Sequence, residues 1–147
     1  MQIEDAREIP PIVLLVENED EGRTLYAKTL QASGFWVTTA ADPDVAMNTA
    51  TELRPNIIVA GLTLDGRTDG FRFIRAVSEH PEIKGTPLVV LSGSPVESLP
   101  RGAHEYAAAV LVKPVAPADL AGEIHRVLAT SHDLRKRSTR PPVSIIR

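Results

Sequence analysis

An acidic run near the start of the chain is the first group of residues that could do chemistry. Glu17, Glu19, Glu21 and Gly22 have the spacing of the first half of a calcium-binding loop. The twelfth position of such a loop requires a bidentate glutamate, but Lys28 stands there. The sequence therefore does not predict a calcium site.

Other catalytic and metal-binding patterns are missing from the sequence. With no cysteine, the chain can form neither a disulfide nor a thiolate zinc site. Its four histidines lack zinc-binding spacing, and it has neither a GxSxG motif nor a phosphate-binding glycine loop. We therefore expect a protein without enzymatic activity of its own.

Five apolar runs predict the strands that must position any functional residues. Residues 12–16 are continuously apolar, which is typical of an inner strand of a parallel sheet, buried on both faces. Residues 35–37, 56–60, 87–91 and 107–112 predict four more strands.

Helical patterns separate the predicted strands. Gly34 is placed to end the first helix, and Asp42 followed by Pro43 predicts the start of the second, which should end before Pro55. Between strands four and five, Pro100 and Gly102 exclude one long helix. The expected inward-facing residues are Leu25, Leu30 and Ala32, then Val45, Ala46, Thr49, Ala50 and Leu53, then Phe71, Ile74 and Val77, and finally Leu120, Ile124, Val127 and Leu128 after Pro117.

Alternation of strands and helices predicts an α/β fold with a doubly wound, five-stranded parallel sheet and helices on both faces. The flavodoxin-like strand order 2-1-3-4-5 is the natural candidate. In such sheets the functional crevice lies at the carboxyl ends of the strands, here beside strands one and three.

Four segments make the chain similar to a known family. VLLVENEDEGR, RPNIIVAGLTLDGRTDGFRFIR, TPLVVLSG and VLVKPV occur in order and at the right spacing. Between residues 12 and 131 the chain resembles the receiver domain of bacterial two-component response regulators. The resemblance implies a signalling module in a phosphorelay, in which a strand-three aspartate accepts a phosphoryl group beside a divalent cation.

The resemblance assigns roles to residues of this chain, but the acceptor is absent. Glu17 and Asn18 match the family's acidic pair, Ser92 its hydroxyl, and Lys113 with Pro114 its lysine–proline pair. Six steps from Pro55, where the family has its aspartate, the chain has Gly61. We expect an atypical receiver without phosphorylation at this position.

Loss of two carboxylates also affects the metal site that the family implies. Asn18 replaces the second acid and Gly61 the acceptor, which leaves Glu17 as the one weak candidate ligand. We therefore expect weak or absent Mg²⁺ binding and no other cofactor. Without an aspartate, Lys113 is either a relic or pairs with Glu17 and closes the pocket, and the second interpretation is favoured.

The loop after Gly61 leaves an alternative open. The family usually has proline four steps and glycine eight steps after the acceptor, whereas this chain has Asp65 and then Gly70 one step late. Asp65 or Asp69 is therefore a candidate substitute acceptor in a conventional phosphorelay. Ser92 either keeps its switching role or simply ends strand four.

The expected signalling surface is formed by helix four, strand five and helix five of the family fold. Val110 stands where the family has its switch aromatic, Tyr106 is the nearest substitute, and Pro100 begins an unusual segment. The expected partner is a histidine kinase or another regulator, and a homodimer through the same surface is a further expectation.

Length and charge complete the picture. The chain has 147 residues, enough for one domain, and no leader or membrane-spanning pattern, so we expect a cytoplasmic protein. We assign residues 1–10 to an extension, 11–131 to the domain and 132–147 to a flexible basic tail.

The tail has net charge +4 and the rest of the chain −7. Its cations are a candidate contact for nucleic acid or an acidic partner, but no aromatic residue accompanies them, and nucleic acid is not the expected partner.

Overall fold

The computed structural model describes residues 9–62, 69–93 and 105–138, without the side chains of Asp69 and of residues 132–138. Five strands form one parallel sheet in the order β2-β1-β3-β4-β5. The strands are β1 (Ile12–Val16), β2 (Trp36–Ala40), β3 (Ile57–Gly61), β4 (Leu88–Ser92) and β5 (Ala109–Val112). The predicted sheet and strand order are confirmed.

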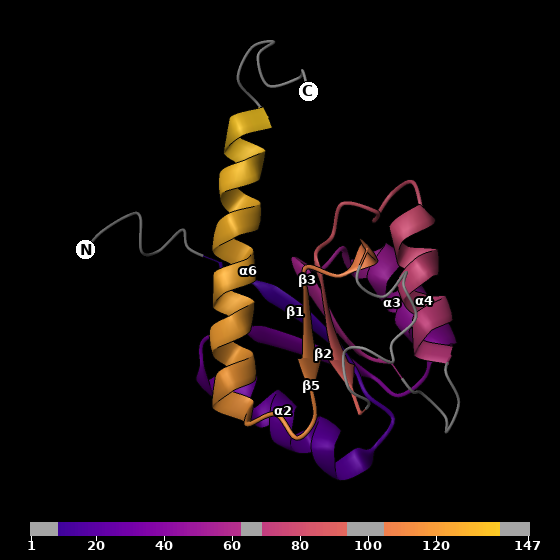
Figure 1. Cartoon of the computed structure of the whole chain (residues 1–147), viewed down its shortest axis with the longest axis vertical. Helices are drawn as coiled ribbons and strands as arrows, with labels where there is room; N and C mark the ends of the chain where they lie inside the picture. Colours follow the sequence, from indigo (N-terminus) through magenta and orange to yellow (C-terminus); the bar gives the residue numbers. More distant parts are fainter. Residues whose placement is uncertain (1–8, 63–68, 94–104, 139–147) are drawn as a thin grey trace, which may run out of the picture.

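Helices cover both faces of the sheet. They are α2 (Asp20–Ala32), α3 (Pro43–Leu53), α4 (Asp69–Glu79) and α6 (Pro117–Ser138). Helices α3 and α4 lie together on one side, and α2 and α6 lie on the other (Figure 1). Each face has its own apolar cluster, because alternate strand residues point to opposite faces. Leu14, Ala60 and Ile74 belong to the α3/α4 side, and Leu15, Val59 and Ile124 belong to the α2/α6 side.

Burial along the strands follows their place in the sheet. Every residue of β3 and β4 is buried, and β1 is buried from Val13 onward. The predicted inner strand is therefore confirmed. The edge strand β5 is only partly buried, because none of the described strands pairs with its outer side.

Local signals for helix ends agree with the structure, but four inward positions were wrong. Asp42 caps α3, since its Oδ1 accepts a hydrogen bond from the backbone nitrogen of Val45 at 2.9 Å. Gly34, after α2, has a φ of 99° that favours glycine. The exposed residues are Leu25, Ala32, Val45 and Leu53, because the buried stripes of α2 and α3 are narrow and these side chains lie beside them.

Helix α6 is longer than predicted. It continues through Ser138 and runs past the sheet (Figure 1), so seven residues assigned to the flexible tail are helical. The reason is that residues 132–138 contain neither glycine nor proline and include good helix formers. Residues 139–147 and the broken element expected around Pro100 lie outside the described residues.

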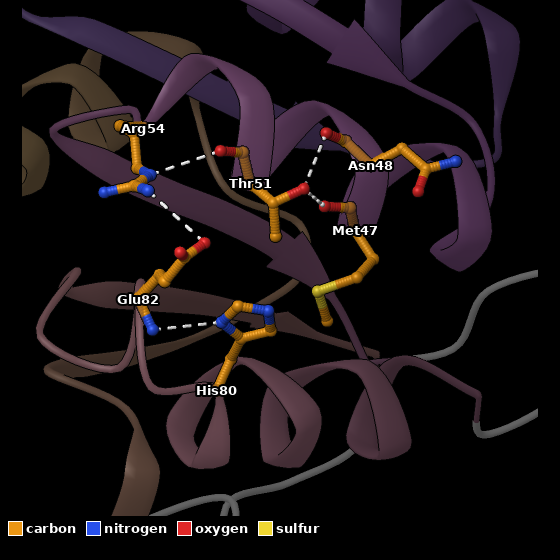
Figure 2. Close-up of polar contacts among 6 residues, drawn as sticks. All are labelled: Met47, Asn48, Thr51, Arg54, His80 and Glu82. Atoms are coloured by element: carbon orange, nitrogen blue, oxygen red, sulfur yellow. Dashed lines mark hydrogen bonds and ion pairs between the residues drawn. The ribbon is translucent and has the colours of Figure 1, made fainter.

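Polar contacts join the end of α3 to the turn that follows α4 (Figure 2). They lie at the amino ends of the strands, away from the candidate site. Arg54, which follows α3, donates to the carbonyl of Thr51 at 3.2 Å and pairs with Glu82 at 3.3 Å. His80 Nδ1 accepts from the backbone nitrogen of Glu82 at 3.1 Å. The end of α3 is thereby tied to the turn that follows α4.

Gly70 lets α4 approach the end of β3. A Cβ atom at this position would lie 2.0 Å from the carbonyl oxygen of Gly61 and 2.4 Å from that of Leu62. Gly70→Ala is therefore expected to lower the free energy of unfolding by about 1–3 kcal/mol, the range for an overpacked core. Urea denaturation measures this loss. Gly122→Ala is the matched control, because nothing lies within 4 Å of its added Cβ and alanine favours the helix; an equal loss in both variants would contradict the close approach.

Candidate functional site

The candidate site lies where three strands end. Glu17 directly follows β1, Gly61 is the last residue of β3, and Lys113 directly follows β5. Odd-numbered residues of these strands belong to the apolar cluster on the α2/α6 side, namely Val13, Leu15, Ile57, Val59, Ala109 and Leu111. By the same alternation, positions 17, 61 and 113 are directed to one side of the sheet.

Glu17 and Lys113 form an ion pair across this edge. The Nζ atom of Lys113 lies 3.1 Å from Oε1 of Glu17. The Glu17 side chain is 2% exposed, whereas that of Lys113 is 33% exposed. The second carboxylate oxygen of Glu17 accepts from the backbone nitrogen of Glu19 at 3.2 Å. The pairing favoured from the sequence is therefore present, and both oxygens of the buried carboxylate have donors.

Helix α2 holds the loop that carries Glu17. Arg23 donates from Nη1 to the backbone carbonyl of Glu17 at 2.8 Å, and its Nη2 pairs with Asp20 at 2.6 Å. Sequence reasoning missed this contact. A basic residue one helical turn after an acidic one was the available signal.

Tyr26 is a second residue that sequence reasoning missed. Its hydroxyl donates to the carbonyl of Val115 at 3.0 Å, which ties α2 to the loop after Lys113. The ring is 8% exposed and lines a hollow of about 380 Å³ with Lys113 and Pro114. Burial raises the pKa of the Tyr26 phenol, although nearby Lys113 opposes this shift. No local pattern joins residues 89 positions apart.

Tyr26→Phe is expected to lower the free energy of unfolding by about 1 kcal/mol, because the Val115 carbonyl loses its donor. The parent should also lose stability as pH rises above about 10. The raised pKa means that the unfolded chain ionises first there, and this loss should be absent in the variant. Unfolding curves at pH 8 and above, with ultraviolet titration of the two tyrosines, measure both effects. A parent and variant with the same pH dependence would contradict the assignment.

The family model described as the response regulator receiver domain matches residues 13–125. The chain belongs to this family. The receiver is 31% identical over 121 residues to the two-component response regulator ORR11 of Oryza sativa subsp. indica, covering 81% of this chain and 82% of that protein. It is 33% identical over 101 residues to the nitrogen assimilation regulatory protein NtrX of Azorhizobium caulinodans, covering 64% of this chain but only 22% of that relative's length.

A solved structure agrees with the receiver fold. The chemotaxis response regulator CheY4 of Vibrio cholerae is 32% identical and superposes with a TM-score of 0.74, over 81% of this chain and 99% of that one. Within the described part of the chain, no helix is both long and apolar enough to cross a membrane.

The remaining matched residues of the receiver have different surroundings. Ser92 ends β4 with 1% exposure, and its carbonyl accepts from the Lys113 nitrogen at 2.7 Å. Asn18 is half-buried beside Glu17. Val110 and Tyr106 pack, partly buried, against the cluster on the α3/α4 side. Asp65, the side chain of Asp69, and Pro100 lie outside the described residues.

The described residues of the pocket do not fit the divalent cation that receivers use. Hard cations require several oxygen ligands, and carboxylates are the strongest. Both oxygens of Glu17 already accept hydrogen bonds, and position 61 offers no side chain. Among the described residues, no three His, Cys, Asp or Glu side chains are grouped to hold a metal ion. Weak Mg²⁺ binding therefore stays a prediction for titration.

Proposed function

We propose that this receiver acts in two-component signalling by binding protein partners, without phosphorylation at the usual position. The observation that carries the proposal is Gly61 at the carboxyl end of β3, directed to the same side as Glu17 and Lys113. A receiver forms its acyl phosphate when a carboxylate oxygen attacks phosphorus. Glycine supplies no such oxygen.

The ion pair between Glu17 and Lys113 is a second observation that supports the proposal. In a conventional receiver, the lysine and the metal neutralise charge on the phosphoryl oxygens. Here the Lys113 ammonium is already neutralised by Glu17 at 3.1 Å. The pair therefore stabilises one arrangement of the β1 and β5 ends without any added charge, and this receiver is expected to hold one signalling conformation.

The proposed partner is a histidine kinase or another regulator, which recognises the surface around β5. Val112 is 39% exposed on this surface, and Val110 and Tyr106, which the sequence assigned to it, are only partly buried. Co-purification from cells tests the partner. Val112→Asp should abolish co-purification of the partner, because it adds a charge to the apolar surface. If the partner still co-purifies with this variant, it binds at another surface.

The experiment that tests the absence of phosphorylation uses the parent protein. We expect incubation with acetyl phosphate and Mg²⁺ to leave the intact mass unchanged, while a conventional receiver treated in parallel gains one phosphoryl group. An adduct on the parent would contradict the proposal. An adduct mapped to Asp65 or Asp69 would support the alternative of a displaced acceptor in an ordinary phosphorelay.

A further inference from the structure

Strand β2 leaves an edge of the sheet open. It is an outer strand, paired only with β1. The nitrogen of Trp36 donates to Pro11, and the carbonyl of Ala40 accepts from Glu17. Since successive residues of a strand direct their backbone groups to opposite sides, the N–H and C=O groups of Val37 and Thr39 point away from the sheet.

Within residues 9–62, 69–93 and 105–138, this edge lacks the features that keep other strands from pairing with it. Natural edges are protected by lysine, proline, a bulge or a covering element. The five residues of β2, WVTTA, contain neither charge nor proline, and they pair with β1 in unbroken register. Thr39 is exposed, and Trp36, the only tryptophan of the chain, is 61% exposed. As far as the described residues go, the edge is therefore available as a template for another strand.

The geometry points to a second copy of this chain, paired antiparallel through β2 about a twofold axis at Thr38. The outward groups of Val37 and Thr39 are two residues apart, which is the spacing of hydrogen-bonded pairs in an antiparallel ladder. With the axis at Thr38, Val37 of each copy faces Thr39 of the other. This is the register in which all five residues of both strands overlap.

Side chains also match across this axis. Ala40 belongs to the cluster on the α3/α4 side, so Trp36 and Thr38 lie on the same face of β2. In the proposed register the exposed indole of Trp36 lies opposite the small Ala40 of the second copy, and the two Thr38 side chains meet at the axis. Cross-strand Thr–Thr pairs of this kind stabilise antiparallel strands.

Helix α2 contacts β2 on the α2/α6 side of the sheet. Gly22 and Leu25 line the hollow beside Lys113, so the opposite flank of α2 is the one that borders the open edge. That flank carries Asp20, Thr24, Ala27 and Gln31 at helical spacing. This flank therefore offers one acidic and three uncharged side chains to a second copy.

The size of the contact predicts a weak dimer. A five-residue strand pair with one aromatic side chain covers less than the roughly 800 Å² per partner of stable complexes. We therefore expect reversible association at high protein concentration, with Trp36 emission shifting to shorter wavelength as the indole leaves water. The inference does not depend on Gly61, and the β2 edge is the opposite edge of the sheet from β5.

Cysteine scanning tests the register, because the natural chain contains no cysteine. Across the axis, the two Thr38 Cα atoms would be about 4.5 Å apart, within the roughly 4.4–6.8 Å that a disulfide spans. The two Thr39 Cα atoms would be about 8 Å apart, from the rise per residue, which is too far for a disulfide. Under mild oxidation, Thr38→Cys should form a disulfide dimer at least about tenfold faster than Thr39→Cys. Thr39 is the more exposed residue, so disulfides formed by random collision of monomers would form faster at Thr39→Cys. Faster dimer formation by Thr39→Cys than by Thr38→Cys would overturn the proposal.

Charge substitutions at the axis provide the second measurement. Thr38→Lys and Thr38→Glu should each abolish the concentration-dependent association in sedimentation, because like charges meet. An equal mixture of the two variants should restore it. Thr130→Lys, an exposed position on α6, is the matched control and should behave as the parent. A parent that stays monomeric at all concentrations, or a mixture that does not associate, would overturn the proposal.

Discussion

The Gly61→Asp variant is expected to take up one phosphoryl group per chain from acetyl phosphate and Mg²⁺, where the parent takes up none. A carboxylate oxygen at position 61 would attack phosphorus, the bond to the acetyl oxygen would break, and acetate would leave. By strand alternation, the new side chain points to the side of Glu17 and Lys113. Intact mass spectrometry over time measures the uptake.

Uptake by Gly61→Asp should be slow, because Asn18 lowers the number of anionic metal ligands. Adding Asn18→Asp is expected to raise the rate at least about tenfold, which equals about 1.4 kcal/mol of activation free energy. Gly61→Asn is the matched control, since it fills the same space without a nucleophile. An adduct on the asparagine variant would place the chemistry elsewhere, and a double variant that folds but stays unmodified would show that the pocket cannot be restored by its carboxylates.

The fold could be read from the sequence where one local signal was sufficient. Continuous apolar runs located β1 and β3, and Asp42 with Pro43 located the start of α3. Counting from Pro55 placed Gly61 at the end of β3, where the structure has it. These features depend on neighbours along the chain, so periodicity and capping chemistry were enough to predict them.

Contacts between distant segments could not be read in the same way. The hydrogen bond from the Tyr26 hydroxyl to the Val115 carbonyl is one example. These two residues come together only because α2 packs against the loop between β5 and α6. Val45 was predicted to point inward, but the buried stripe of α3 consists of Ala46 and Ala50, and Val45 is 49% exposed. The pairing of Glu17 with Lys113 was predictable because both residues follow parallel strands, whose carboxyl ends meet at one edge.

The Lys113→Ala variant is expected to lose about 3 kcal/mol of unfolding free energy, at the lower end for a broken buried pair because Lys113 is partly exposed. The substitution leaves the Glu17 carboxylate, which is 2% exposed, with the Glu19 backbone nitrogen as its remaining donor. Urea denaturation measures the loss, and Lys84→Ala, at an exposed position, is the control that should change stability by less than about 0.5 kcal/mol.

A double-mutant cycle separates the ion pair from other effects of removing the lysine. Glu17→Gln removes the charge but keeps the shape, and Lys113, being 33% exposed, can still reach water. We therefore expect Glu17→Gln to cost less than Lys113→Ala, and the double variant to cost less than the sum of the two by at least about 1 kcal/mol. Additive losses would mean that Glu17 and Lys113 stabilise the fold independently. The attraction between the two charges would then not stabilise the closed pocket. Some other contact would have to hold this receiver in one conformation.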